Sequence, residues 1–191
     1  MAYLEHASHT AGRTPALTLR WGITLVVAAV VVALAARLAV PVPGTPVPMA
    51  LSPLAVLIVG GILGARGGAG ALAGYVGAGA MGLPVFAAGG GAAYLLGPTG
   101  GYVLAFPIAA ALVGALAAPG RLGRSSLAAA AGMAVIHLGG IAQLTILGGD
   151  AAQAWRWGSL PFLFGDVLKI AIAGVLIARL TPSVRSYLAA R

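Results

Sequence analysis

The chain has 191 residues, of which 60% are hydrophobic and only 7% are charged. A soluble domain carries about 25% charged residues, so this composition excludes an ordinary water-soluble fold and indicates an integral membrane protein. The formal net charge is +8, but the basic residues fall singly between apolar runs, which argues against a nucleic-acid-binding protein. There is no cysteine, so neither a disulfide nor a thiolate metal site is expected.

The first twenty residues are mostly polar and predict a cytoplasmic N-terminal tail at 1–20. The apolar run after Arg20 contains Ala33-Leu34-Ala35, a small-residue pattern that also occurs at the cleavage site of signal peptides. Cleavage there would leave five membrane segments and would disturb the distribution of arginines along the chain. We therefore interpret this run as the first membrane helix.

Six apolar segments follow one another, and most are close to the roughly 20 residues that a helix needs to cross a bilayer. They cover residues 21–40, 53–65, 69–87, 101–118, 126–148 and 160–180, the second being rather short. Glycines spaced by four, such as Gly60, Gly64 and Gly68, are typical of membrane helices with closely packed backbones. The sequence predicts an all-α integral membrane protein with six transmembrane helices at 21–180 and a basic cytoplasmic tail at 181–191.

The basic residues predict the orientation, because lysine and arginine are enriched in cytoplasmic loops. Eight arginines lie on the side of the termini: Arg13, Arg20, Arg66, Arg121, Arg124, Arg179, Arg185 and Arg191. Only Arg37 and Arg156 fall on the opposite side. Both termini are therefore expected to be cytoplasmic.

Two uncharged connections on the predicted outer side are rich in proline or glycine. The loop at 41–48 has four prolines, so it should be extended and semi-rigid. Two interpretations stay open for it, a lid beside a pocket or a simple helix breaker. The connection from Gly82 to Tyr102 lacks both a phosphate-binding motif and a nearby basic residue, which argues against a nucleotide site. Irregular backbone at membrane depth persists only where it is buried or lines a cavity, so both connections are candidate pocket walls.

Asp166 and Lys169 are the charges that a membrane segment tolerates least. Their spacing of i, i+3 places both on one face of a helix at the start of the last segment. A charged side chain deep in a bilayer costs roughly 2.5–3.5 kcal/mol on insertion scales, and such residues usually mark a functional site. We predict that the two residues form the floor of a ligand pocket. The alternative is an ion pair that neutralises itself and only fixes helix packing.

The remaining polar residues do not suggest a catalytic set. His137 and Gln143 in the fifth segment are interpreted as packing or interhelical hydrogen-bonding groups, and Asp150 as a loop residue. An intramembrane enzyme would need a nucleophile with a base, paired carboxylates or a metal cluster, and the sequence indicates none of these. A self-sufficient carrier built from inverted repeats is a further alternative, but no convincing repeat is present.

Four motifs together resemble the BioY family, the biotin-specific substrate-binding (S) components of energy-coupling factor (ECF) transporters. They are Val47-Pro-Met, Gly82-Leu-Pro-Val-Phe86, Gly97-Pro-Thr-Gly-Gly-Tyr102 and Pro161-Phe-Leu-Phe-Gly-Asp-Val-Leu-Lys169. The resemblance implies a multi-pass protein of the bacterial cytoplasmic (inner) membrane that captures biotin and has no ATPase site of its own. It also implies a transmembrane coupling (T) subunit and two cytoplasmic ATPase subunits as partners, with no cofactor.

The resemblance further implies which residues are functional. The Asp and Lys of the Gly-Asp-x-x-Lys motif, which contact biotin in the family, correspond to Asp166 and Lys169. Ala29 and Ala33 match the Ala-x-x-x-Ala pattern with which S components dock on the coupling subunit. The chain departs from the family at positions 50 and 52, where alanine and serine replace a common threonine and glutamine. Ligand contacts made from those two positions are therefore not expected to carry over.

The chemistry of biotin suits these residues. An ionised Asp166 can accept hydrogen bonds from the ureido N–H groups, and Lys169 can donate to the ureido carbonyl or to the tail carboxylate. The sequence does not decide between these two acceptors. The rest of the wall is expected to be apolar and aromatic. The aromatic candidates near the outer end are Phe86, Tyr94, Tyr102, Trp155, Trp157 and Phe162.

Overall fold

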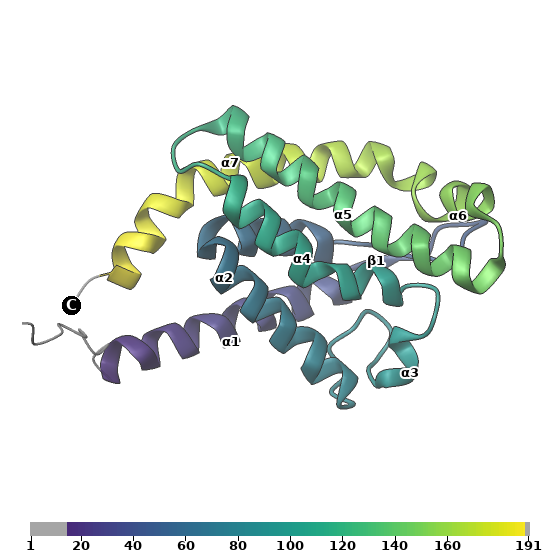
Figure 1. Cartoon of the computed structure of the whole chain (residues 1–191), viewed down its shortest axis with the longest axis horizontal. Coiled ribbons are helices and arrows are strands. Elements are labelled where there is room, and N and C mark those ends of the chain that lie inside the picture. Colours follow the sequence, from purple (N-terminus) through teal and green to yellow (C-terminus); the bar gives the residue numbers. More distant parts are fainter. Residues whose placement is uncertain (1–14, 190–191) are drawn as a thin grey trace, which may run out of the picture.

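The computed structural model describes residues 15–189, which are mainly helical (Figure 1). The elements are α1 (Pro15–Arg37), β1 (Ala39–Val40), β2 (Met49–Ala50), α2 (Ser52–Ala80), α3 (Ala92–Leu95), α4 (Gly100–Leu116), α5 (Leu122–Gly148), α6 (Ala151–Gly158), the 3-10 turn η1 (Leu160–Phe162) and α7 (Leu163–Ala189). The all-α fold is confirmed apart from the two-residue strands. Most of the tail predicted at 1–20 lies outside the described residues, and most of the tail predicted at 181–191 is helical.

Helix α2 is a hairpin of two helical halves. Gly64 has φ 76° and ψ 175°, a conformation that is nearly restricted to glycine, and it interrupts the helix. A Cβ atom on Gly68 would lie 2.8 Å from the Cα of Gly60, so the two halves pack with their backbones in contact. The glycine spacing seen in the sequence thus includes the residue that reverses the chain.

The predicted membrane segments correspond to α1, the two halves of α2, α4, α5 and α7. The second half of α2 ends at Ala80, earlier than predicted, because Gly82 with φ 102° belongs to a turn. By length and composition, four helical stretches of the described chain are long and apolar enough to cross a membrane, and α4 is a shorter apolar helix.

Small residues bring α4 close to its neighbours. A Cβ atom on Gly60 of α2 would lie 2.5 Å from the carbonyl oxygen of Ala110 in α4. A Cβ atom on Gly101 of α4 would lie 2.2 Å from the carbonyl oxygen of Gly139 in α5. Such close backbone contacts are the usual way in which membrane helices gain packing energy, since lipid supplies no hydrophobic drive between them.

The sides of the bundle are apolar. Large hydrophobic side chains of α1 and α7 are exposed, among them Ile23, Val27, Leu34, Phe164 and Leu168. Exposed apolar surface on this scale is unfavourable in water and is typical of a surface that contacts lipid.

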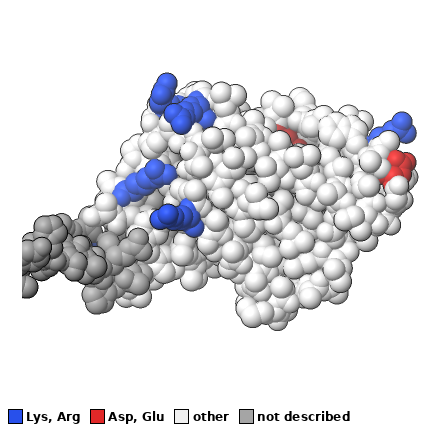
Figure 2. Space-filling model, viewed as in Figure 1, with Lys and Arg blue, Asp and Glu red and all other residues white. Residues whose placement is uncertain are grey.

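The two ends of the bundle differ in charge. The start of α1, the turn in α2, the α4–α5 connection and the end of α7 lie at one end, which we call the arginine-rich end (Figure 1). Its described arginines are Arg20, Arg66, Arg121, Arg124, Arg179 and Arg185. The antiparallel strands β1 and β2, α3 and α6 lie at the opposite end, the α6 end. Figure 2 shows blue side chains gathered at the arginine-rich end, and one blue and one red group together at the α6 end.

Two of these arginines also complete helix ends. Nε of Arg124 donates to the carbonyl oxygen of Leu116 at 2.8 Å, at the end of α4. Nε of Arg185 donates to the carbonyl oxygen of Ile62 at 3.0 Å, at the end of the first half of α2. The last carbonyls of a helix lack partners within it, and basic side chains are favourable partners there.

Candidate functional site

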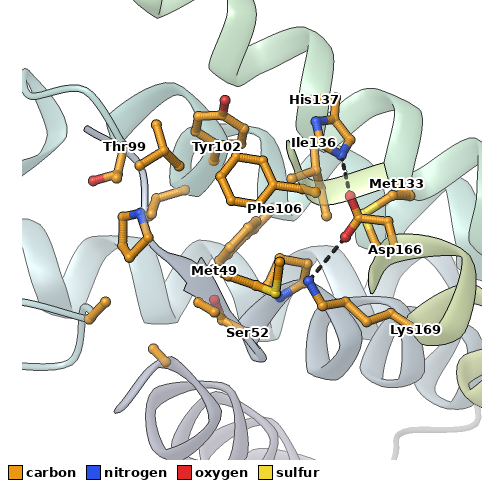
Figure 3. A pocket seen from close by; sticks show the side chains of 18 of the residues that line it. Met49, Ser52, Thr99, Tyr102, Phe106, Met133, Ile136, His137, Asp166 and Lys169 are labelled. Atoms are coloured by element: carbon orange, nitrogen blue, oxygen red, sulfur yellow. Dashed lines mark hydrogen bonds and ion pairs between the residues drawn. The ribbon is translucent and has the colours of Figure 1, made fainter. Parts of the chain in front are cut away.

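A cavity opens among the helices near the α6 end (Figure 3). Its volume is about 630 Å³, including space open to the outside. Its walls come from the end of the proline-rich loop, the first turn of α2, the connection before α4, and helices α4, α5 and α7.

Asp166 and Lys169 border this cavity from the first turns of α7. Pro161 and the turn η1 start the helix, and the spacing of three residues directs both side chains to the same side. Nζ of Lys169 lies 3.0 Å from Oδ1 of Asp166, and the two residues are 7% and 4% exposed. The charges therefore pair with each other and also face a cavity.

His137 of α5 joins this pair and also lines the cavity. Its Nε2 lies 2.8 Å from Oδ2 of Asp166. Its Nδ1 lies 2.8 Å from Oγ of Ser159 and 3.3 Å from the carbonyl oxygen of Gly158. An interhelical hydrogen bond was expected here, but a place in the site was not. The sequence did contain one indication that His137 belongs to the site, because it is the one histidine inside a predicted membrane segment.

Tyr102 of α4 ties three elements together beside His137. Its hydroxyl donates to the carbonyl oxygen of Gly158 at 2.6 Å, and its ring faces the His137 ring edge-on with centroids 6.3 Å apart. Gly140 of α5 leaves room for the ring, because a Cβ atom there would lie 2.0 Å from Cζ of Tyr102. The wall on this side therefore depends on a glycine in the neighbouring helix.

The other predicted aromatic residues have different positions. Tyr94 and Phe162 line the cavity. Phe86 is fully buried behind Tyr94 and stacks on it with centroids 4.9 Å apart, so it supports the wall without bordering the cavity. Trp155 and Trp157 lie exposed on α6, outside the cavity, where tryptophans of membrane proteins commonly meet the bilayer interface.

The structure thus brings together Asp166, Lys169, Tyr94, Tyr102 and Phe162 of the predicted substrate-binding residues. Nothing in the sequence singled out the apolar remainder of the wall, because these residues have the same character as ordinary core residues of membrane helices. They include Tyr75, Phe106, Met133 and Ile136.

The proline-rich loop contributes one side of the cavity. Val47 and Pro48 line it, which is the position that a lid requires. Oγ1 of Thr45 donates to the carbonyl oxygen of Trp157 at 2.8 Å and so attaches the loop to α6. Ala50 and Ser52, the positions that depart from the family pattern, also border the cavity.

The glycine-rich connection is held from α5. Nε2 of Gln143 donates to the carbonyl oxygens of Leu95 and Gly97, each at 2.8 Å. This places Thr99 at the cavity wall. The backbone carbonyls of an irregular segment need such partners when they are removed from water.

Ala29 and Ala33, the predicted docking residues, lie on α1 and are not among the residues that line the cavity. Both are half-buried and border a groove between α1 and the second half of α2. The groove is lined by small and apolar side chains such as Gly70, Gly74 and Ala78. Docking at this groove stays a prediction.

Comparisons with known proteins found two matches. The sequence model of the BioY family matches residues 10–186. A crystal structure of the S-component for biotin from an ECF-type ABC transporter has a TM-score of 0.79 and 22% sequence identity, covering 89% of this chain and 95% of that one. No curated protein sequence matches. At this identity the structural likeness establishes a shared fold, and the family match extends over most of the chain.

Proposed function

Because the chain belongs to the BioY family, we propose that it captures biotin as the substrate-binding component of an ECF-type transporter. The observation that carries this proposal is the buried Asp166–Lys169 pair, which borders a cavity lined by aromatic and apolar side chains. A charge pair that only joined helices would need no cavity beside it. Burial makes such a pair costly, so a ligand that completes its hydrogen bonding accounts for its presence.

The free hydrogen-bonding capacity of the pair suits biotin. An ammonium has three N–H donors, and Asp166 is the one acceptor of Lys169 among the described residues. Lys169 can therefore donate to an oxygen of the ligand. Each carboxylate oxygen of Asp166 has one donor near it and a second lone pair for a ureido N–H. The rings of Tyr94, Tyr102 and Phe162 supply apolar contacts for the bicyclic ring.

Calorimetry on the purified full chain tests this function directly. Protein produced without biotin and held in detergent is expected to bind biotin saturably, and the biotin should be recovered chemically unchanged. Thiamine, a vitamin without a ureido group, is the control and should give no binding heat. Absence of biotin binding would contradict the proposed function, and conversion of biotin would point to an enzyme instead.

The chain is a transporter component rather than an enzyme, and we propose that a coupling (T) subunit and two cytoplasmic ATPase subunits power uphill uptake. The sequence contains no Gly-x-x-x-x-Gly-Lys-Ser/Thr motif for binding nucleotide phosphates. The coupling subunit docks at Ala29 and Ala33, where the exposed face of α1 is apolar.

We further propose six membrane spans in the bacterial cytoplasmic membrane, with the arginine-rich end in the cytoplasm. Because the chain has no cysteine, single cysteines can report the orientation. Gln153→Cys on α6 and Ser183→Cys near the end of α7 both replace exposed residues. A membrane-impermeant maleimide applied to intact cells should label Gln153→Cys and leave Ser183→Cys unlabelled until the membrane is opened. The opposite labelling pattern would reverse the topology.

A further inference from the structure

Four polar side chains form a continuous hydrogen-bonded series from the α6–α7 junction to the cavity, which we call the polar chain: Ser159, His137, Asp166 and Lys169. Successive contacts measure 2.8 Å, 2.8 Å and 3.0 Å. Figure 3 shows the two contacts of Asp166, with its oxygens turned toward different partners. Ser159 is fully buried and does not border the cavity, whereas the other three residues do.

From Ser159 to Asp166 the donors of the polar chain run in one direction, and Lys169 donates to Asp166 from the other side. An ionised carboxylate can only accept, so Nε2 of His137 carries the proton that it shares with Asp166. In a neutral imidazole Nδ1 is then an acceptor and needs a donor. The carbonyl oxygen of Gly158 cannot donate and already accepts from Tyr102. Among the described residues, the hydroxyl of Ser159 is the donor within reach of Nδ1.

A neutral His137 also balances the charge of the site. Asp166 and Lys169 sum to zero, whereas a doubly protonated imidazole would leave one positive charge without a counterion inside the bundle. Uncompensated buried charge is strongly unfavourable. The series Ser159 to His137 to Asp166 satisfies every polar atom in it without adding a charge.

We propose that His137 and Ser159 are positioning residues for biotin capture, which orient the carboxylate of Asp166 and through it the ammonium of Lys169. This inference rests on the proposed function. A salt bridge between residues three apart on one helix allows several side-chain rotamers. The second donor, His137, comes from α5 and restricts Asp166 to the orientation with Oδ2 toward α5 and Oδ1 toward Lys169. Holding the site in its binding geometry before the ligand arrives strengthens binding.

Nitrogen NMR of the full chain labelled with ¹⁵N-histidine tests the donor direction without biotin. The His137 signals are identified by their loss in His137→Gln. The ring is expected as the neutral tautomer with hydrogen on Nε2, both in the wild type and in Ser159→Ala, because the carboxylate of Asp166 holds the proton on Nε2 in both. A wild-type ring with hydrogen on Nδ1, or on both nitrogens, would overturn the proposal while leaving biotin binding itself unaffected.

Biotin affinity measures the positioning effect. Ser159→Ala should weaken binding about fivefold to tenfold, the size of one hydrogen bond. Ser125→Ala is the matched control, because Ser125 is equally buried and donates to the carbonyl oxygen of Ala118 away from the cavity. In an Asp166→Asn background, Ser159→Ala should cause no further loss. An equal loss in both backgrounds would show a structural role only and overturn the proposal.

Two replacements of His137 separate its contacts. Glutamine places an amide nitrogen near the position of Nε2 and can still donate to Asp166, whereas asparagine reaches only the side of Ser159. Asparagine should weaken biotin binding at least about tenfold, and glutamine should recover most of that loss. Equal losses in both variants would overturn the proposal. Wild-type protein that fails to bind biotin would instead contradict the proposed function itself.

Discussion

Replacing Asp166 by asparagine or Lys169 by methionine is expected to weaken biotin binding by at least about 30-fold. Truncating one partner of a buried, hydrogen-bonded charge pair costs about 2–5 kcal/mol, which corresponds to that factor or more. Both side chains are nearly fully buried and border the cavity, so each change removes a proposed ligand contact and leaves the remaining charge without its counterion. Calorimetry on the purified variants measures the effect.

Thermal unfolding without ligand separates binding from stability in these variants. Each single change leaves one buried charge uncompensated and should destabilise the protein, whereas the double variant should unfold closer to the wild type. Asp150→Asn is the control for affinity, because Asp150 is exposed at the start of α6, where asparagine also caps a helix. Unchanged biotin affinity in both single variants would remove the two residues from the site.

Gly140→Ala is expected to destabilise the protein by about 1–3 kcal/mol, the usual cost of overpacking, and to weaken biotin binding about tenfold. The added Cβ atom would lie within 2.2 Å of three ring atoms of Tyr102, so the ring has to leave its position. The hydrogen bond from Tyr102 to Gly158 and one wall of the cavity would change with it. Thermal unfolding and calorimetry measure the two effects.

Gly123→Ala, in the same helix, is the matched control. A Cβ atom there has no neighbouring atom within 4 Å, so the change should be neutral or stabilise the helix by up to about 1 kcal/mol. If Gly140→Ala behaved like Gly123→Ala, Tyr102 would not be packed against α5 as described.

Composition and local spacing were enough to predict the helical membrane architecture and the Asp166–Lys169 pair. Apolar segments and isolated charges are read along the chain, and a spacing of three residues on a helix brings two side chains together whatever the tertiary structure. The same reasoning did not identify Gly64 as the break in α2, because neighbouring glycines such as Gly60 and Gly68 look equivalent in sequence. Which of them adopts positive φ depends on how the two halves pack.

Contacts between segments that are far apart in the chain could not be predicted from the sequence alone. His137 reaches Asp166 because α5 and α7 lie side by side, a relation that no local pattern contains. The sequence did not predict the orientation of the aromatic residues either. Tyr94 faces the cavity, and Phe86 lies behind Tyr94. Trp157 was predicted in the site, but the amphipathic helix α6 carries its side chain outward.

For the proposed function, the turn at Gly64 shortens the distance that a bound vitamin would have left to travel. The first half of α2 begins at the cavity with Ser52 and ends at the arginine-rich end, and its residues 52–63 span only about 18 Å. The hydrocarbon layer of a bilayer is about 30 Å thick. In the proposed orientation, with this half along the membrane normal, biotin in the cavity would have passed roughly two fifths of that thickness, and release into the cell would require a passage only along the remaining stretch.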